Sequence, residues 1–422
     1  MTYRAYFKLQ FKLLSPLSIG DSFSEKTDKD IILDSRGLPV IPATSIAGVL
    51  RSLAGDNKDA LFGCIAEYKY EDGKKVMKKP QKDSQLIFYD AALVTDSANE
   101  ACDCVATRDC VALDEYKTAR AGSKFDFQAV ETDAVFVGYA EARDQDAKVE
   151  LEKLLNNALS FGSKTTRGYG KVELSYQCIV FNPNVSGTNA QEVLKKWLDF
   201  DMFNWPDGDW VDVQPPINSN GITLKLQLKQ QGGLSIRQYQ TDISTNEQQS
   251  ADYGPVSLRD GTPVIPGTSW AGMFKHHMEA LLGKELPEAF GFVLTDEKEK
   301  EAKKREERTC QKAKIAFSES QIKNGKPKLL TRNMIDRFTN GTKDGALYTE
   351  LTVYDGTTAL EITLDKDIPP DVKRALCVTI MDLNNGYATV GGLTAVGRGL
   401  FKITQVNGEP FNGTFEEVLC CV

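Results

Sequence analysis

Two loops rich in carboxylates hold the side chains best suited to chemistry on a phosphate ester. The acids of the two loops are Asp21, Glu25, Asp28, Asp30 and Asp34 in the first half of the chain, and Asp242, Glu247, Asp252 and Asp260 in the second. Carboxylates in a mobile loop rich in Ser and Thr can position a divalent cation or orient a hydroxyl group for attack on phosphorus. Acids that are merely solvated are the simpler interpretation of the same pattern.

Histidines are too few for the commonest kinds of acid–base catalysis. The chain has only His276 and His277, which are adjacent. A Ser-His-Asp triad, a ribonuclease with a histidine pair and a zinc site with two separated histidines are therefore nearly excluded. Any catalysis must rely on carboxylates, lysines, tyrosines or a metal ion.

Two glycine-rich loops could hold phosphates and stack a base. The first, over 161–170, offers unhindered amides, hydroxyls, cations and a ring, and its candidate binding residues are Lys164, Thr165, Arg167, Gly168 and Tyr169. The second, over 391–399, keeps the glycines and one arginine, with Gly397 and Arg398 as candidates. A helix C-cap followed by a tight turn would explain the glycines without any ligand.

Two helices are expected to begin directly after Pro-rich turns, with Ser45 and Ser269 as N-caps. Free amides and the helix dipole at such a start favour an anion. The candidate anion-binding residues are Thr44, Ser45 and Arg51 in the first half, and Thr268, Ser269 and Lys275 in the second. Capping alone would also explain the Ser and Thr residues.

Each half also contains a long polar excursion between its middle strands. Basic residues mixed with apolar tips suit a protrusion that wedges into a nucleic-acid duplex, whereas a plain β-hairpin is the simpler alternative. The candidate tip residues are Leu113, Tyr116 and Arg120 in the first excursion, and Met334, Arg337 and Phe338 in the second.

The nine cysteines form no disulfide framework, and no export signal precedes them. This pattern predicts reduced thiols and a cytoplasmic protein. Four of them could ligate zinc (Cys64, Cys102, Cys104 and Cys110), but their spacing is not that of a standard zinc site. The stretch 296–308 has six acids and six bases and is interpreted as a solvated helix or an insertion.

An internal repeat organises these candidates. The segment 37–45, GLPVIPATS, returns at 261–269 as GTPVIPGTS, and Phe62-Gly63 returns as Phe290-Gly291. The glycine loops follow in the same order. A tandem duplication explains this matching order.

Each repeat is expected to run strand, helix, strands, helix and strand, which is the α+β pattern of a ferredoxin-like (RRM-like) antiparallel sheet. The predicted boundaries are a first domain over 1–198 with its excursion at about 105–137, and a second domain over 221–422 with a charged insertion at about 294–312 and its excursion at about 329–352. Residues 199–220, acidic and then Pro-rich, are expected to form a linker.

Composition excludes several classes of protein. The 422 residues carry 51 Lys and Arg against 59 Asp and Glu, with 41% hydrophobic residues. These values argue against disorder, collagen and a membrane-spanning protein. The net charge of −8 disfavours nucleic acid only weakly, because five of the excess negative charges lie in the segment 199–212 and screening acts over roughly 8 Å.

The Pro-rich turn that opens a helix, Ile335-Asp336-Arg337 in the second excursion and the glycine loop near each domain end resemble the RAMP superfamily of CRISPR-associated proteins. More narrowly, the chain resembles Cas seven-type backbone subunits of type III effector complexes. Two such domains in one chain are similar to the fused double subunit of type III-D systems.

This resemblance implies that the glycine loops and helix starts hold guide RNA, and that the excursions are thumbs that interrupt the guide–target duplex. It also implies a catalytic Asp beside each thumb, which falls on Asp28 in the first repeat. In the second repeat Tyr253 falls on the expected acid and Asp252 lies one residue away. The first thumb has Leu113-Asp114-Glu115 where Ile-Asp-Arg is usual.

The leading hypothesis is an RNA-binding subunit that cleaves target RNA at regular intervals, with Mg²⁺ or Mn²⁺ bound near Asp28. The expected partners are guide RNA, target RNA and other subunits of the complex, without a membrane. A non-catalytic scaffold of the same complex is the alternative, and a guide-processing endoribonuclease is a third possibility.

Overall fold

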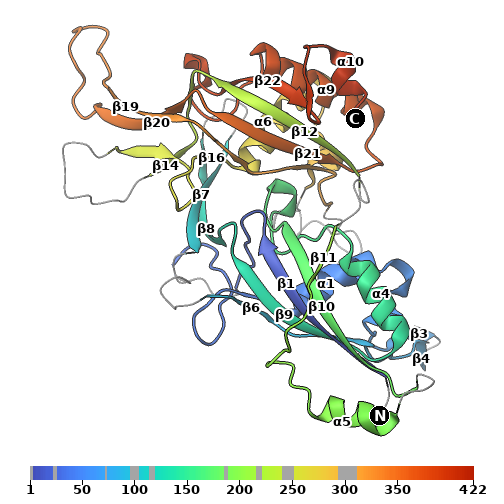
Figure 1. The fold of residues 1–422 in the computed structure, drawn as a ribbon. Helices are drawn as coiled ribbons and strands as arrows, with labels where there is room; N and C mark the ends of the chain where they lie inside the picture. The colour runs from blue at the N-terminus through green and yellow to red at the C-terminus, as the bar shows by residue number, and fades with distance from the viewer. Residues whose placement is uncertain are drawn as a thin grey trace. The chain divides into compact units, whose positions relative to one another are not determined.

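The computed structural model describes residues 3–21, 26–71, 74–95, 104–113, 119–184, 189–214, 221–239, 251–292 and 311–422. They form two compact units (Figure 1). Unit 1 comprises Met1–Ala106, Gln128–Ser163 and Gly170–Ser219, and unit 2 comprises Thr107–Phe127, Lys164–Tyr169 and Asn220–Val422. Glu25, Cys102, Tyr116, Asp242, Glu247 and the charged stretch 296–308 lie outside the described residues.

Unit 1 is built on one antiparallel sheet. Its main strands lie in the order β10 (Val172–Phe181), β1 (Arg4–Leu13), β9 (Val135–Ala142) and β6 (Ala91–Leu93). Strands β11 (Val211–Asp212) and β2 (Val40–Ile41) pair at the edges, and β5 (Leu86–Phe88) also pairs with β9. Every second residue of β1 is buried, as its alternating sequence predicts.

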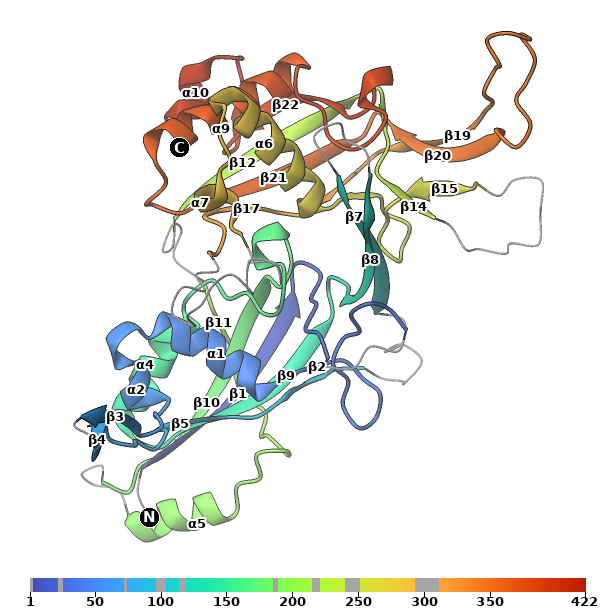
Figure 2. The ribbon, with the colours of Figure 1, turned by 180° about the vertical axis from the view of Figure 1, so that it is seen from behind.

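The helices α1 (Ala43–Leu53) and α4 (Gln145–Leu155) cover one face of this sheet (Figure 2). Ile46 and Leu50 of α1 and Leu151 of α4 join Phe7 and Leu9 of β1 in one buried cluster. Smaller elements complete the unit: η1 (Gly55–Asn57), α2 (Lys58–Leu61), the paired strands β3 (Glu67–Glu71) and β4 (Lys74–Lys79), and α5 (Ala190–Leu198).

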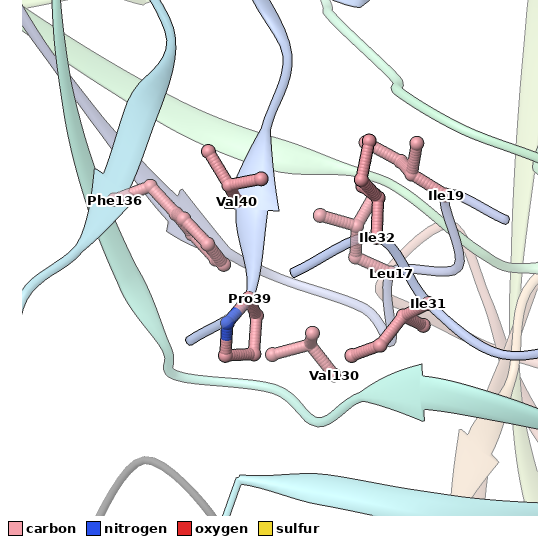
Figure 3. A pocket seen from close by; sticks show the side chains of 8 residues that line it. All are labelled: Leu17, Ile19, Ile31, Ile32, Pro39, Val40, Val130 and Phe136. Atoms are coloured by element: carbon pink, nitrogen blue, oxygen red, sulfur yellow. The ribbon is translucent and has the colours of Figure 1, made fainter. Parts of the chain in front are cut away.

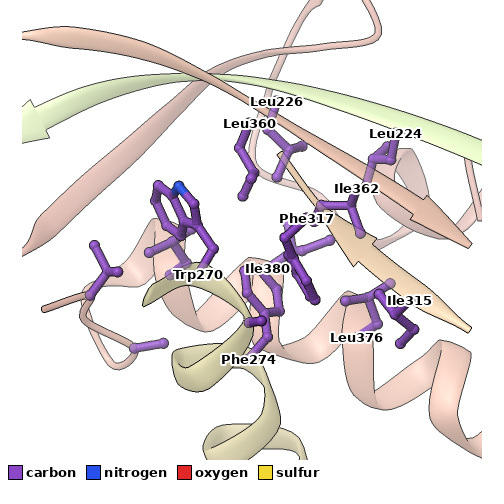
Figure 4. Close-up of a cluster of buried hydrophobic side chains, with 14 of the residues drawn as sticks. Leu224, Leu226, Trp270, Phe274, Ile315, Phe317, Leu360, Ile362, Leu376 and Ile380 are labelled. Atoms are coloured by element: carbon purple, nitrogen blue, oxygen red, sulfur yellow. The ribbon is translucent and has the colours of Figure 1, made fainter. Parts of the chain in front are cut away.

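Unit 2 repeats this plan in the order β17 (Ile315–Phe317), β21 (Thr357–Leu364), β12 (Ile222–Gln231), β22 (Leu400–Val406) and β23 (Glu409–Pro410). Helices α6 (Gly267–Leu282) and α9 (Pro370–Asn385) pack on it. Trp270 and Phe274 of α6 meet Ile380 of α9 and Leu226 of β12 in its core (Figure 4). The remaining elements are β16 (Val264–Ile265), β18 (Ser320–Gln321), α7 (Pro287–Phe290), η4 (Thr394–Val396) and α10 (Phe415–Leu419).

The strand order confirms the predicted fold class twice. If the four main strands of each repeat are numbered along the chain, their order across the sheet is 4-1-3-2, which is β10-β1-β9-β6 in unit 1 and β22-β12-β21-β17 in unit 2. In the sequence, one helix comes after the first strand and one after the third. This is the antiparallel order of a ferredoxin-like domain. The chain is therefore an α+β protein with two ferredoxin-like domains.

Both polar excursions form paired strands. The first consists of β7 (Val105–Leu113) and β8 (Ala119–Val130), whose outer part belongs to unit 2. The second consists of β19 (Lys326–Arg332) and β20 (Tyr348–Tyr354), which belong to a sheet with β13 (Gly233–Leu234), β15 (Tyr253–Pro255) and β14 (Arg237–Tyr239).

Two local expectations need correction. The helices begin earlier than predicted, because Pro42 and Pro266 occupy the N-cap positions and Ser45 and Ser269 lie inside the first turn. Proline suits this place since its fixed φ matches the helix start and it needs no amide partner. The acidic part of the segment 199–220, expected to form a linker, packs on unit 1, where Phe200 contacts Tyr6.

In the part of the chain that the structure describes, no helix has both the length and the apolar character needed to cross a membrane.

Candidate nucleic-acid interface

The second thumb ends in an exposed apolar tip. Strands β19 and β20 project from their sheet and are joined by the loop 333–347 (Figure 1). Phe338 is 98% exposed and Met334 is 58% exposed at this tip, and Arg337 is also exposed. Large apolar side chains held in solvent at the end of a β-ribbon suit insertion between stacked bases.

Asp336 holds the backbone of this tip in shape. Its Oδ1 atom accepts the N–H groups of Thr339 and Phe338, both at 2.9 Å. These two hydrogen bonds, the one from Thr339 first, hold the pKa of the Asp336 carboxyl below its usual value. The aspartate of the Ile-Asp-Arg motif therefore positions the neighbouring Phe338.

A buried carboxylate at the base of the second thumb gathers three arginines. Glu350 on β20 is only 2% exposed, and its Oε1 atom accepts a hydrogen bond from Arg398 Nη2 at 2.7 Å. Arg332 Nε lies 3.8 Å from the same oxygen, and Arg237 Nη2 lies 3.6 Å from Oε2. The side chains of Arg237 and Arg332 are more than one third exposed. Three guanidinium groups around one carboxylate leave an excess of positive charge that can bind phosphate oxygens.

An aromatic pair adjoins these arginines. The rings of Tyr253 and Tyr348 stack with centroids 5.8 Å apart, and the guanidinium of Arg237 lies over Tyr253 at 4.3 Å. A stacked ring pair beside cationic groups is the combination that holds unpaired bases.

Asp252 is tied to the second thumb. Its carboxylate Oδ2 accepts the backbone N–H of Thr349 at 2.7 Å, and its own N–H donates to Thr349 O at 2.9 Å. The predicted catalytic acid of the second repeat is thus bound to the strand β20 by two hydrogen bonds.

The acidic loop of the first repeat is held beside the first thumb in a similar way. Gln128 at the end of β8 donates its backbone N–H to Lys29 O at 2.9 Å, and its side-chain Oε1 accepts from Ile31 N at 3.3 Å. The carboxylate of Asp30 closes the loop by accepting the N–H of Thr27 at 2.9 Å. Asp28 lies between these anchors with its side chain exposed.

The described part of this loop forms no ready-made cage for a divalent ion. In the ranges that the structure describes, no three side chains of His, Cys, Asp or Glu come together as a metal site. The exposed Asp28 offers one carboxylate, and Mg²⁺ in proteins is usually held by one or two carboxylates together with waters and substrate phosphates. Asp28 is therefore the residue that would hold such an ion beside a bound phosphodiester.

Residues Lys164–Tyr169 of the first glycine loop belong to unit 2. Tyr169 is 2% exposed and packs edge-on against Phe127, and Arg167 Nη2 donates to Phe290 O at 3.0 Å. Desolvation by burial lowers the pKa of Arg167. A Cβ at Gly168 would overlap the backbone nitrogen of Glu319. The expectation that Tyr169 stacks on a base is wrong for this structure because its ring is enclosed.

Lys164 and Thr165 of the same loop are half-buried. The Lys164 ammonium lies over the rings of Phe127 and Phe125, so its contacts within unit 2 are cation–π contacts. Tight packing, rather than an open phosphate cradle, explains this loop.

The second glycine loop is partly open. Gly397 is exposed with φ at 79°, and nothing would lie within 4 Å of a Cβ there. Arg398 is 3% exposed and is bound to Glu350 and to the hydroxyl of Tyr354 at 3.0 Å. Arg398 thus stabilises the thumb base and does not reach a phosphate directly, contrary to expectation.

The helix starts are already covered. An Asp90 carboxylate accepts the N–H of Ala43 at 2.7 Å, so an anionic group occupies the first turn that contains Thr44 and Ser45. Arg51 is bound to Asp59 at 2.7 Å. The Asp90 carboxylate thus fills the anion position that the sequence predicts at this helix start, and the predicted cation Arg51 is paired within unit 1.

At the start of α6, a Cβ at Gly267 would overlap the carbonyl oxygen of Arg167, so the glycine loop packs against this helix end. Thr268 and Ser269 are half-buried. Lys275 is exposed and lies 3.9 Å from Glu279. Of the predicted residues at this helix start, Lys275 is the most accessible.

The first thumb also has a buried arginine. Arg108 on β7 is 3% exposed, donates to Ser257 O at 3.3 Å and lies 3.9 Å from Glu319. Arg120 is exposed, and Leu113 is the last residue of β7. Tyr116 lies outside the described residues.

The proposed zinc ligands give no support for zinc in the part of the chain that can be described. Cys64, Cys104 and Cys110 are all half-buried, and the Cys64 thiol contacts Pro80 O at 3.4 Å. Cys102 lies outside the described residues.

A small cavity in unit 1 is not a ligand site. It is lined by eight apolar residues, among them Leu17, Ile31 and Phe136, and has a volume of about 10 Å³ (Figure 3). This space holds at most one water molecule.

Sequence reasoning missed the residues that matter most at the second thumb. Glu350, Arg237, Arg332 and Tyr348 come from three segments that only the folded sheet brings together. One signal of this cluster was present in the sequence. Tyr253 stands where the resemblance implies an acid, and in the structure its ring contacts Tyr348 and Arg237.

Comparison with known proteins agrees with the duplication. The profile of the RAMP superfamily matches residues 10–173 and 249–402, which together cover more than half of the chain. No curated protein matches. One solved structure with similarity, titled as a Type III-B Cmr-beta cryo-EM structure of the apo state, is 14% identical with a TM-score of 0.31, over 41% of this chain and 96% of that one.

Proposed function

Since the chain belongs to the RAMP superfamily through two copies of its domain, we propose that it is a backbone subunit of a type III CRISPR effector complex. Its partners are guide RNA, target RNA and the other subunits of that complex. The fusion of two domains in 422 residues supports the double subunit of type III-D systems.

One observation carries this proposal. In each repeat the acidic loop is hydrogen-bonded to the returning strand of the thumb, through Gln128 N and Lys29 O in the first and through Asp252 N and Thr349 O in the second. A thumb that unstacks one nucleotide of a duplex would present the adjacent phosphodiester to this loop. Chemistry and substrate distortion would then occur at the same place.

The cleaving group of the proposed reaction is Asp28. Its exposed carboxylate takes the proton of the RNA 2′-hydroxyl as the 2′-oxygen attacks the adjacent phosphorus. The bond from phosphorus to the 5′-oxygen breaks, and water protonates that oxygen. The products are a 2′,3′-cyclic phosphate and a 5′-hydroxyl end, and most of the acceleration comes from in-line geometry.

The two repeats differ in this proposal. The Asp252 carboxylate is bound to Thr349 N, and Tyr253 stacks on Tyr348 under Arg237. The second repeat is therefore proposed to hold RNA, and the first to cleave it.

The test uses the guide-loaded complex and a labelled target RNA. Asp28→Asn is expected to remove specific cuts without loss of target binding, whereas Asp252→Asn and the control Asp21→Asn leave them. Cleavage by the Asp28→Asn variant at the wild-type positions and rate would overturn the assignment. A wild-type complex that binds but never cuts would favour the non-catalytic scaffold.

A guide-processing endoribonuclease is a weaker candidate. His277 Nε2 lies 2.7 Å from Asp382 Oδ2, so this imidazole bridges α6 and α9. Discrete cuts in precursor guide RNA by the isolated chain, lost in His276→Ala, would support this function instead.

A further inference from the structure

The segment 199–213 lies across the face of the unit 1 sheet opposite α1 and α4. Phe200 contacts Tyr6 and Phe181 with ring centroids 5.1 and 5.4 Å away, and Trp205 lies 6.0 Å from Tyr139. Further along, the Lys8 ammonium lies 5.6 Å from the Trp210 ring, and β11 pairs with the edge strand β10. We call residues 199–213 the strap.

The strap begins from a helix that has no buried residue. Trp197 of α5 donates its indole N–H to the Tyr6 hydroxyl at 3.0 Å, which fixes α5 to the same face. Leu198 is nevertheless 68% exposed and Leu194 is also exposed. Since α5 is amphipathic, Leu194 and Leu198 leave part of its apolar side without cover in the described part of unit 1.

The strap itself continues this apolar surface. Phe203 is 76% exposed, although its ring lies edge-on to that of Tyr139 with the centroids 5.7 Å apart. Trp210 and Val211 are exposed as well. Aromatic side chains exposed on a fixed backbone are enriched in protein–protein interfaces, because they bury area with little loss of conformational entropy.

Charge selects the kind of partner. The strap contains five aspartates and no Lys or Arg, and all five are exposed (Asp199, Asp201, Asp207, Asp209 and Asp212). Such a surface repels the RNA backbone and attracts a protein surface that carries lysine or arginine.

We infer that α5 and the strap form a docking surface for a basic, amphipathic segment of a partner protein. Apolar side chains of the partner cover Leu198 and Phe203, and its cations pair with the strap aspartates. This surface lies on unit 1 alone and does not depend on RNA binding by the thumbs. Its test is therefore independent of the proposed function.

The test measures binding of the full chain to a synthetic amphipathic helix of Leu and Lys by fluorescence anisotropy. A matched helix of Leu and Glu and a single-stranded RNA serve as comparison probes. We expect binding of the Leu/Lys helix alone, and affinity roughly tenfold lower after Asp199, Asp201, Asp207 and Asp209 are changed to Asn. Rising salt should weaken the wild-type interaction more than that of the variant.

A second variant separates apolar docking from charge attraction. Leu198→Ser with Phe203→Ser should lower affinity for the Leu/Lys helix while leaving the far-ultraviolet circular dichroism unchanged, because both side chains are exposed. Equal affinity of wild type and both variants would overturn the proposal. Strap-dependent binding of RNA would overturn it as well, as would a strap-dependent dimer of this chain that excludes the helix.

Discussion

Arg398, from the second glycine loop, donates to Glu350, on the returning strand of the second thumb, at 2.7 Å, and both side chains are almost completely buried. The bond joins the loop that precedes the last strand to the base of the thumb. The thumb is therefore anchored to its domain by a buried ion pair. Its orientation is set by this pair and by the sheet that carries β20.

Glu350→Gln should destabilise unit 2. The substitution keeps the shape of the side chain but leaves the Arg398 guanidinium buried without its counter-charge, which costs about 3–5 kcal/mol. Asp355→Asn is the matched control, since Asp355 pairs with Lys326 in solvent, where such pairs contribute about 1 kcal/mol or less. Urea denaturation of both variants compares the two losses, and similar values would contradict the role of the buried pair.

Phe338→Ala should impair RNA distortion without affecting folding. The side chain is 98% exposed, so we expect a stability change within about 0.5 kcal/mol. In a guide-loaded complex, 2-aminopurine placed in the target should fluoresce less with the variant, because fewer bases are unstacked. Tyr387→Ala, another exposed aromatic residue in unit 2, serves as the control. Unchanged fluorescence in Phe338→Ala would exclude this residue as the wedge.

The sequence was enough to predict the repeat, the α+β class and the two protruding strand pairs. These features depend on local periodicity and on motif order, which a chain displays without its tertiary contacts. The alternation of Phe7, Leu9 and Phe11 is an example, since all three are buried on one face of β1.

The roles of the glycine loops could not be predicted in the same way. Gly168 and Gly397 occupy matching places in the repeats, yet one packs against Glu319 and the other faces solvent. What a loop contacts depends on segments distant in sequence. The arginines around Glu350 could not be predicted for the same reason, because they come from segments distant in sequence.

Replacing Arg237 and Arg332 by Gln should weaken RNA binding in a salt-dependent manner. Each lost phosphate contact lowers the slope of log affinity against log salt by about 1. We therefore expect the double variant to show a shallower slope and an affinity that falls uniformly across RNA sequences. Lys284→Gln, which removes an exposed cation paired with Asp371, should leave the slope unchanged. An unaltered slope in the arginine variant would remove the thumb base from the interface.

Acid should loosen the tip of the second thumb. Backbone hydrogen bonds to the carboxylate hold the pKa of Asp336 below its usual value in the folded chain. The stabilisation is therefore present above the pKa of the unfolded chain and is lost as the pH falls through the lower folded pKa. The amide resonances of Phe338 and Thr339 should titrate with a midpoint below that of the aspartate in an unstructured peptide of the same sequence, and Asp336→Asn should abolish the transition. A midpoint equal to or above that of the peptide would contradict the hydrogen bonds.

Gly168→Ala and Gly397→Ala should differ strongly although both residues have positive φ, at 85° and 79°. At Gly397 the added methyl group meets open space, so only the backbone strain of about 1–2 kcal/mol remains. At Gly168 the same group overlaps the backbone of Ser318 and Glu319, which cannot move aside as a flexible side chain can. We therefore expect a further loss of about 1–3 kcal/mol in the free energy of unfolding. Thermal unfolding of the two variants tests this difference directly. Equal losses would mean that the first glycine loop is not packed as described and would restore it as an open binding loop.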